Sequence, residues 1–262
     1  MPSEDNINAA FSKQSSHFDE DDCTNSVLQQ WRKKIYAHID QFLKPNSTIL
    51  ELNAGTGIDA VRLASRGHRV HATDLSDGMI AQLEKMAIAW SEKITVQQIS
   101  FQNLSEVNGK FDFVFSNFGG LNCADDLTKV AHELPRLLNP GAYLTWVIMP
   151  PVCPWELSWI LKGQFKKAFR RLKGKTTAHL ESEFFTTYYH SLRDVKSALG
   201  PRFMLLMAEG LGIFSPPPAA ANFVKDHPMV TQFLNRLDQL FHKNFPFNRC
   251  GDHIVVSFRF NF

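Results

Sequence analysis

The chain has 262 residues, of which 44% are hydrophobic and 21% are charged. This length predicts one large domain, or one domain with an added segment, whose core can form without metal ions or disulfides. The composition excludes a disordered tail, a collagen-like repeat and a disulfide-stapled miniprotein. With 28 basic and 26 acidic side chains the formal net charge is +2, which does not favour nucleic acid as the main partner.

The cysteines form no C-x-x-C pair, so the sequence predicts neither a metal site nor a disulfide framework. The N-terminal residues are acidic and polar and lack the apolar run of a signal peptide. No stretch of 18 apolar residues occurs, so we expect no membrane span. These features predict a soluble, cytoplasmic protein. The cysteines are Cys23, Cys123, Cys153 and Cys250.

The first 25 residues carry six acids and one lysine, which predicts a loose or ligand-ordered arm. Apolar residues at helical spacing then predict a helix over residues 26–43. From there, short apolar strands alternate with helices, the pattern of parallel crossover units. The predicted strands are Thr48–Leu52, Arg69–Thr73, Ile94–Ile99, Phe111–Ser116 and Ala142–Met149, and the predicted helices between them are Gly55–Ser65, Asp77–Trp90 and Asp125–Leu138.

After Pro150 and Pro151 the pattern changes, and residues 154–190 are predicted to form a helical, basic and aromatic insertion. The alternation then resumes and ends in a pair of strands at one edge of the sheet. We predict an arm and helix at 1–45, a cofactor-binding core at 46–150, a cap at 151–200 and edge strands at 201–262. The last predicted elements are the helix Asp194–Leu199, the strand Phe203–Ala208, the helix Met229–Lys243 and the strand Asp252–Phe260.

Residues 49–60, ILELNAGTGIDA, end a strand, pass through a loop of small residues and open a helix. Small residues let the backbone pass close beneath a ligand, and the helix N-terminus offers unpaired N–H groups. Asp74 ends the second strand, 17 residues after Gly57, where a carboxylate can accept both hydroxyls of an adenosine ribose. Together these features predict a nucleoside-type ligand.

Dinucleotide sites use G-x-G-x-x-G against a pyrophosphate. Here Asp59 lies in the first helical turn, where a pyrophosphate would approach, and this disfavours NAD. The run E-x-N-x-G-x-G with Asp74 instead resembles motif I and the following acidic position of the class I S-adenosylmethionine-dependent methyltransferases. The resemblance continues through DLSDGMI at 74–80, FDFVFSNF at 111–118 and LLNPGA at 137–142.

This resemblance implies an α/β, doubly wound, Rossmann-like fold with a seven-stranded, mostly parallel sheet, an antiparallel edge strand and a helical cap insertion. It implies S-adenosyl-L-methionine as cofactor and S-adenosyl-L-homocysteine as product. The methionine part would lie against Glu51 and the 53–57 loop, the ribose against Asp74, and the sulfonium beside residues 116–118. The cofactor-binding residues implied are Glu51, Asn53, Ala54, Gly55, Thr56, Gly57, Asp74, Leu75, Met79, Ser100, Phe101, Gln102, Ser116, Asn117 and Phe118.

The sequence departs from the family pattern in two places. Asn53 replaces the first glycine of motif I, and asparagine tolerates the left-handed backbone better than other non-glycine residues. The acid that usually follows the third strand and faces the adenine amine is missing, because that stretch contains Ser100, Phe101 and Gln102. Ser100 or the backbone of Phe101 would have to replace it.

Methyl transfer from a sulfonium depends mainly on positioning, although a hydroxyl acceptor also needs a general base. His190, which follows the cap, is the predicted base; His179 and His253 are alternatives, and each could instead be a surface or capping histidine. We expect a small-molecule acceptor, aromatic or anionic, methylated on oxygen or nitrogen, and a monomer or homodimer. Phe11 and His17 in the arm could close over the cofactor with Phe18. The predicted acceptor-binding residues are Phe18, Asn122, Trp155, Tyr188 and Tyr189.

Residues 162–175 contain seven basic side chains and no acid, with apolar residues at helical spacing, which predicts an amphipathic basic helix. It could cap the core with a solvated basic face, attract an anionic acceptor, lie on a membrane surface or contact RNA. Two other functions remain open: a nicotinamide-dependent oxidoreductase and a non-catalytic cofactor-binding protein. Only the methyltransferase hypothesis and the non-catalytic one predict tight binding of S-adenosylhomocysteine.

Overall fold

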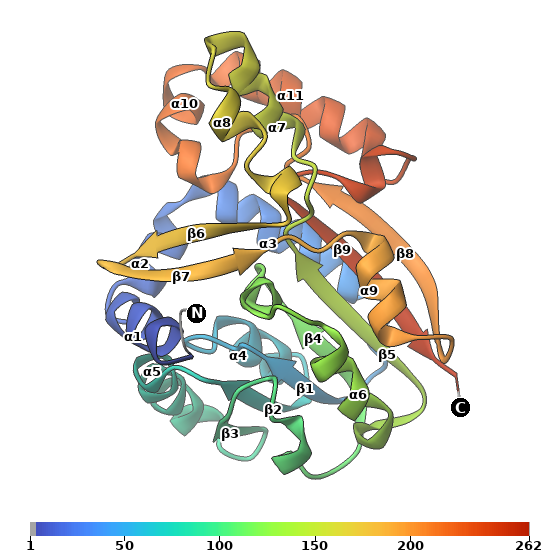
Figure 1. Cartoon of the computed structure of the whole chain (residues 1–262). Helices are drawn as coiled ribbons and strands as arrows, with labels where there is room; N and C mark the ends of the chain where they lie inside the picture. The colour runs from blue at the N-terminus through green and yellow to red at the C-terminus, as the bar shows by residue number, and fades with distance from the viewer. Residues whose placement is uncertain (1–3, 262) are drawn as a thin grey trace.

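The computed structural model, which describes residues 4–261, contains a sheet whose seven strands lie side by side (Figure 1). Their order is β3 (Ile94–Gln98), β2 (Arg69–Asp74), β1 (Thr48–Leu52), β4 (Phe111–Ser116), β5 (Leu138–Ile148), β9 (His253–Phe260) and β8 (Phe203–Leu211). β1 to β5 are parallel, and β9 runs antiparallel between β5 and β8. The predicted mostly parallel sheet with a C-terminal pair at one edge is confirmed. The strand order reverses between β1 and β4, where loops diverge and ligands bind in such folds.

Helices cover both faces of the sheet, as the apolar strands require. Ile49 and Leu50 are neighbours in β1 and point to opposite faces, yet both are fully buried, each in its own hydrophobic cluster. One face is covered by α3 (Ser26–Ile39), α4 (Ile58–Ser65) and α5 (Asp77–Ala87), and the other by α6 (Thr128–Leu137) and α9 (Leu192–Leu199). Among residues 4–261, no helix combines the length and apolarity needed to cross a bilayer.

The N-terminal arm forms two helices, α1 (Glu4–Gln14) and α2 (Phe18–Thr24), so the prediction of a loose arm is wrong. Long-range contacts that the local sequence does not reveal hold α1 in place. Ser12 Oγ lies 2.9 Å from Ser76 Oγ and accepts the N–H of Gly78 at 2.9 Å. A Cβ at position 78 would lie 2.5 Å from the Ser12 carbonyl oxygen, so only glycine lets α1 approach α5 this closely.

The insertion is helical only in its first half. Short helical turns include α7 (Pro154–Leu157) and α8 (Phe165–Ala168), after which β6 (Lys175–Leu180) and β7 (Glu183–Tyr188) form a hairpin. The prediction of helix over residues 154–190 is therefore wrong for the hairpin. Its two turn residues, Glu181 and Ser182, have φ of 50° and 64°. Turns of this kind normally use Asn-Gly or Asp-Gly, so the sequence carries no clear signal for it.

The hairpin extends from the upper lobe of the molecule to α1 (Figure 1). Lys13 in α1 pairs with Glu183 at 2.6 Å, and Asn6 donates to the carbonyl of Phe184 at 3.1 Å. The upper lobe itself is built from α7, α8, α10 (Ala221–Asp226) and α11 (Pro228–Phe241). The arm and the hairpin thus meet above the carboxyl ends of the strands.

Candidate active site

A cavity of about 250 Å³ lies at the carboxyl ends of β1, β2 and β4, between the sheet, the arm and the hairpin. Most of the predicted cofactor residues line it. Glu51, Gly57 and Ser116 do not. Among the predicted acceptor residues, Phe18 and Asn122 line the cavity, whereas Trp155, Tyr188 and Tyr189 do not. The predicted cofactor residues in its wall are Asn53, Ala54, Gly55, Thr56, Asp74, Leu75, Met79, Ser100, Phe101, Gln102, Asn117 and Phe118.

The loop after β1 and the carboxylate at the end of β2 are in direct contact. The N–H of Gly55 donates to Asp74 Oδ2 at 2.9 Å, and the N–H of Ser76 donates to Oδ1 at 2.9 Å. Burial raises the pKa of Asp74, and these backbone donors oppose that shift. Gly55 has φ of 59°, and no atom of residues 4–261 outside its chain neighbours lies within 4 Å of where its Cβ would be. The two features predicted to hold one ligand therefore meet at the wall of one cavity.

Asn53 adopts the left-handed backbone of the glycine that it replaces, with φ of 48°. Its side chain connects β1 to β4, because it donates to the carbonyl of Asn117 at 3.0 Å and accepts from Ser116 Oγ at 2.5 Å. A Cβ at Gly120 would lie 2.3 Å from Asn53 Cγ, so this arrangement also requires a glycine there. The departure from the family motif is thus compensated by contacts between the loop after β1 and the end of β4, and Ser116 supports the loop instead of lining the cavity.

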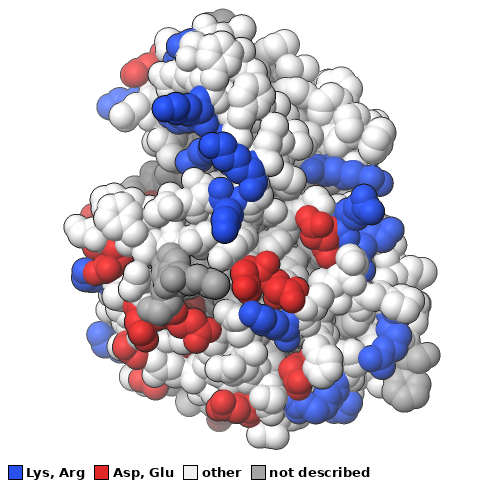
Figure 2. Space-filling model, in the orientation of Figure 1, with Lys and Arg blue, Asp and Glu red and all other residues white. Residues whose placement is uncertain are grey.

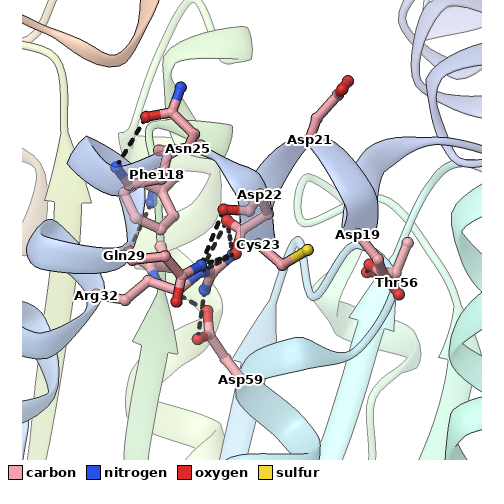
Figure 3. Close-up of polar contacts among 12 residues, drawn as sticks. Asp19, Asp21, Asp22, Cys23, Asn25, Gln29, Arg32, Thr56, Asp59 and Phe118 are labelled. Atoms are coloured by element: carbon pink, nitrogen blue, oxygen red, sulfur yellow. Dashed lines mark hydrogen bonds and ion pairs between the residues drawn. The ribbon is translucent and has the colours of Figure 1, made fainter. Parts of the chain in front are cut away.

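A buried charge network supports the opposite wall (Figure 3). Arg32 in α3 donates through Nε to both carboxylate oxygens of Asp22, at 2.9 and 3.0 Å, and through a terminal nitrogen to Asp59 at 2.7 Å. Asn117 and Tyr36 also donate to Asp59. Burial alone would lower the pKa of Arg32, but the two carboxylates raise it. Arg32 lines the cavity, and the sequence analysis missed it because no local motif links position 32 to positions 22 and 59.

The second arm helix, α2, is held against the loop after β1 (Figure 3). Thr56 Oγ1 donates to Asp19 at 2.5 Å, and Asp22 from the same helix is bound by Arg32. Phe11 and Phe18 from the two arm helices line the cavity. The arm therefore forms one wall of the site and covers it from solvent. His17 pairs with Glu181 of the hairpin turn at 3.1 Å and does not line the cavity.

Carboxylates dominate the electrostatics of the cavity. Glu4, Asp59 and Asp74 line it, and the only basic side chain in its wall, among the residues described, is Arg32. Beneath the loop, Glu51 is buried, and burial together with Asp59 and Asp74 raises its pKa well above its usual range. A surplus of negative charge favours a cationic ligand and opposes a pyrophosphate. The negative charge of the cavity therefore agrees with the prediction, made from Asp59, that the site does not bind NAD.

Glu51→Gln is expected to stabilise the ligand-free protein at neutral pH. The raised pKa of Glu51 means that its contribution to stability is complete below about 4.5 and is lost as the pH rises through the folded-state pKa. Glutamine has no such dependence, so its melting temperature should fall less between about pH 5 and pH 8 than that of the wild type. Calorimetry at several pH values tests this, with the exposed Glu84→Gln as control; parallel profiles for wild type and Glu51→Gln would contradict it.

None of the three candidate histidines lines the cavity. His190 Nε2 is bonded to the carbonyl of Ala124 at 2.9 Å, and burial lowers the pKa of His190. His179 stacks on Phe184 in the hairpin, and His253 packs edge-on against Phe118 with its ring 6.1 Å away. The structure therefore does not bring the predicted base to the site.

Several of the predicted acceptor residues contact other parts of the protein instead of the cavity. Asn122 donates to the carbonyls of Met149 and Tyr188 at 2.9 and 2.6 Å and accepts the Met149 N–H at 2.8 Å, so it joins three segments. Trp155 packs on Phe223 in the upper lobe, and Tyr189 lies beneath Arg171. The apolar part of the cavity is instead formed by Phe11 and Phe118, which the sequence analysis had named, and by Met149 and Phe185, which it had not.

Residues 49–141 match the protein family described as "Methyltransferase domain". This segment is a methyltransferase domain. It contains the loop after β1, Asp74 and the β4 loop, and thus most of the cavity wall. The predicted resemblance is confirmed.

Curated relatives agree with the assignment of the methyltransferase domain. Demethylmenaquinone methyltransferase from Corynebacterium glutamicum is 32% identical over 129 residues, which cover 47% of this chain and 52% of that protein. The enzyme of the same name from Beutenbergia cavernae is 28% identical over 200 residues, covering 73% of this chain and 78% of that protein. The chain thus spans about half the length of the Corynebacterium relative.

Solved structures share the fold over nearly the whole chain. Burkholderia thailandensis 1,6-didemethyltoxoflavin-N1-methyltransferase, solved with 1,6-didemethyltoxoflavin and S-adenosylhomocysteine, has a TM-score of 0.58 at 16% identity and covers 100% of this chain and 91% of its own. An S-adenosylmethionine-dependent methyltransferase from Clostridium acetobutylicum has a TM-score of 0.58 at 14% identity, covering 89% and 92%. At these identities the likeness establishes the fold of the methyltransferase domain and its additions.

Outside the methyltransferase domain, Cys153, Glu156 and Asp252 come close enough together to resemble a metal site. However, Arg171 donates to Glu156 at 2.7 Å and to Asp252 at 2.6 Å. Burial raises the pKa of the Cys153 thiol to about 12, which keeps it protonated at neutral pH. The guanidinium thus already neutralises the two carboxylates that a cation would need.

Proposed function

We propose that this protein binds S-adenosylmethionine in the cavity and catalyses the transfer of its methyl group to a small-molecule acceptor. The observation that carries the proposal is the 2.9 Å hydrogen bond from Gly55 to Asp74, at the wall of a cavity lined by three carboxylates and one arginine. This arrangement suits a ligand that combines a ribose with positive charge. An adenosyl sulfonium has both properties.

The residues present fit such a ligand. Asp74 retains free lone pairs beside the two backbone donors and would accept the ribose hydroxyls. Leu75 and Met79 would contact the adenine, and the open backbone at Gly55 leaves room for the methionine part. When bound, the sulfonium supplies a methyl group that is already activated for displacement. The protein then has to exclude water, which Phe11 and Phe18 do, and to orient the acceptor.

We assign adenine recognition to an arm residue that the sequence analysis passed over. Glu4 at the start of α1 lines the cavity and accepts hydrogen bonds from Ser100 Oγ at 2.7 Å and Gln102 Nε2 at 3.3 Å. Ser100 to Gln102 is the stretch where the family usually carries the acid that faces the adenine amine. Glu4 therefore brings a carboxylate to that position from a different part of the chain.

The acceptor end of the cavity is apolar and aromatic, which supports an apolar or aromatic acceptor. Relatives named for demethylmenaquinone and 1,6-didemethyltoxoflavin are consistent with a small molecule. Because no histidine lines the site in the described part of the chain, we propose an acceptor whose nitrogen or oxygen is unprotonated when it binds.

Calorimetric titration of the purified protein with S-adenosylhomocysteine and with NAD tests the cofactor assignment. We expect binding of S-adenosylhomocysteine and none of NAD; the reverse result would establish the oxidoreductase alternative. Incubation with methyl-labelled S-adenosylmethionine and a panel of aromatic amines and phenols then tests transfer. Binding without transfer to any acceptor would favour the non-catalytic alternative.

Glu4→Gln should weaken binding of S-adenosylhomocysteine by about 2- to 12-fold, or roughly 0.5–1.5 kcal/mol, because a neutral amide replaces the charged carboxylate and one of its two acceptor atoms becomes a donor. It should affect the analogue in which hypoxanthine replaces adenine much less, because that analogue lacks the amine. Titration of both ligands measures the ratio. The neighbouring exposed acid provides the control Asp5→Asn, which should change neither affinity; an unchanged ratio in Glu4→Gln would remove Glu4 from the site.

A further inference from the structure

The upper lobe presents apolar side chains to solvent. Leu161 is 90% exposed, Phe165 58%, Leu172 52% and Phe169 40%. The sequence placed these residues on the apolar face of a predicted helix, and packing of that face on the core was one of the alternatives left open. The structure breaks that helix at Gly163 and near Arg171, and the face is left uncovered.

The same segment carries basic side chains that have no carboxylate partner. The exceptions are the arginines: Arg171 is buried and Arg170 is partly exposed, and they pair with Glu156 at 2.7 and 2.6 Å. In contrast, none of the five lysines forms an ion pair with any residue in the 4–261 range. These lysines are Lys162, Lys166, Lys167, Lys173 and Lys175. Figure 2 shows basic side chains as a band over the lobe, whereas the acidic side chains gather lower on this face.

The ion pairs of Arg170 and Arg171 fix the segment to the rest of the protein, while its lysines and apolar side chains face solvent. Arg171 is buried and joins Glu156 in α7 to Asp252, at the start of the antiparallel strand. Lys167 lies over the ring of Trp159, with its nitrogen 3.6 Å from the ring centre. α7 also packs on α10 through Trp155 and Phe223, so the helices of the lobe support one another. We call the four apolar residues and five lysines the lobe surface.

We propose that the lobe surface docks on an anionic phospholipid membrane. Apolar side chains of this kind insert among acyl chains and headgroups, and unpaired lysines beside them are attracted to the negative surface. The exposed leucines Leu161 and Leu172 suit lipid and have no role in RNA binding, which uses aromatic rings and arginines, whereas the rings of Phe165 and Phe169 suit either partner. An acidic protein partner would explain the lysines but not the 90% exposure of Leu161.

Docking through the lobe surface would bring the cavity close to an acceptor in the membrane. This part of the inference rests on the proposed function. The hairpin leaves the lobe directly after Lys173, and its second strand contributes Phe185 and Thr187 to the cavity wall. Lys175 of the lobe surface begins the first strand, whose residues Thr176 and Ala178 pair with Thr187 and Phe185. The lobe surface and this part of the cavity wall therefore lie within one strand length of each other. An apolar acceptor dissolved in the membrane would reach the cavity from this side.

Sedimentation of the full chain with phosphatidylcholine vesicles, with and without about one third phosphatidylglycerol, tests the proposal. We expect binding to the anionic vesicles that weakens at high salt. Leu161→Ser/Phe165→Ser and Lys166→Gln/Lys173→Gln should each lower the partition coefficient at least about tenfold. The matched controls, Ile88→Ser at a 75% exposed position of the methyltransferase domain and Lys85→Gln nearby, should bind like the wild type.

Calorimetry with S-adenosylhomocysteine separates this proposal from the proposed function, because all four variants should retain the wild-type affinity. No binding to anionic vesicles at low salt would overturn membrane docking even if the cofactor binds. A dimer in sedimentation velocity that Leu161→Ser/Phe165→Ser dissociates, without lipid binding, would assign the lobe surface to a second copy of the chain. Lysine-dependent binding of single-stranded RNA, without lipid binding, would also overturn it.

Discussion

Arg32→Met is expected to lower the free energy of unfolding by about 3–5 kcal/mol, since it leaves two buried carboxylates without a cation. The side chains of Arg32, Asp22 and Asp59 are each less than a tenth exposed. Asp59 would keep its hydrogen bonds from Asn117 and Tyr36, but of the side-chain donors in the described part of the chain Asp22 would keep only Gln29. Because Asp22 belongs to α2, we also expect faster proteolysis of the arm. Urea unfolding and limited trypsin digestion measure the two effects.

The exposed pair of Lys129 and Asp125 provides a matched control for Arg32→Met. Both of its side chains are half exposed, so Lys129→Met should cost less than about 1 kcal/mol. Arg32→Met combined with Asp22→Leu should recover part of the loss, because the pair is replaced by apolar side chains. If Arg32→Met costs no more than Lys129→Met, the network does not hold the arm against the site.

Asp74→Ala is expected to weaken binding of S-adenosylhomocysteine by about 10- to 150-fold, equivalent to roughly 1.5–3 kcal/mol for a charge-assisted hydrogen bond. The substitution removes the ribose acceptor and also releases the N–H groups of Gly55 and Ser76, so the loop after β1 loses its fixed position. Both effects act in the same direction. Calorimetric titration measures the affinity, and circular dichroism shows whether the sheet remains intact.

The exposed acid on α5 supplies the control, since Glu84→Ala should leave the affinity unchanged. Asp74→Asn separates the two effects, because an amide oxygen can still accept from the loop but carries no charge. We expect an intermediate loss for it. Wild-type affinity in a folded Asp74→Ala protein would mean that the ribose lies elsewhere.

Two residues of this chain occupy the places of the family residues that its motif lacks. Asn53 fills the place of a glycine with a side chain that bonds across to the fourth strand. Glu4 stands where an acid is missing after the third strand. Both compensations involve contacts between segments distant in sequence, and the arm supplies one of them. Deletion of the arm would therefore remove a carboxylate from the cavity wall as well as a cover.

The sequence by itself determined the sheet, the loop around Gly55 and its pairing with Asp74. Local spacing encodes these features, since a strand, a turn of small residues and a helix must follow one another to cross the sheet. The sequence also identified many of the residues that line the cavity, because the loops after parallel strands converge at one edge of the sheet.

Only the tertiary structure decided which distant side chains complete the site. Arg32, Glu4 and Phe185 reach the cavity from a helix, the arm and a hairpin, and no periodicity relates them to positions 55 or 74. For the same reason, His190 follows the insertion in sequence but turns to the carbonyl of Ala124. The uncovered lobe surface was hidden as well, because helical spacing identifies an apolar face but not whether anything packs against it.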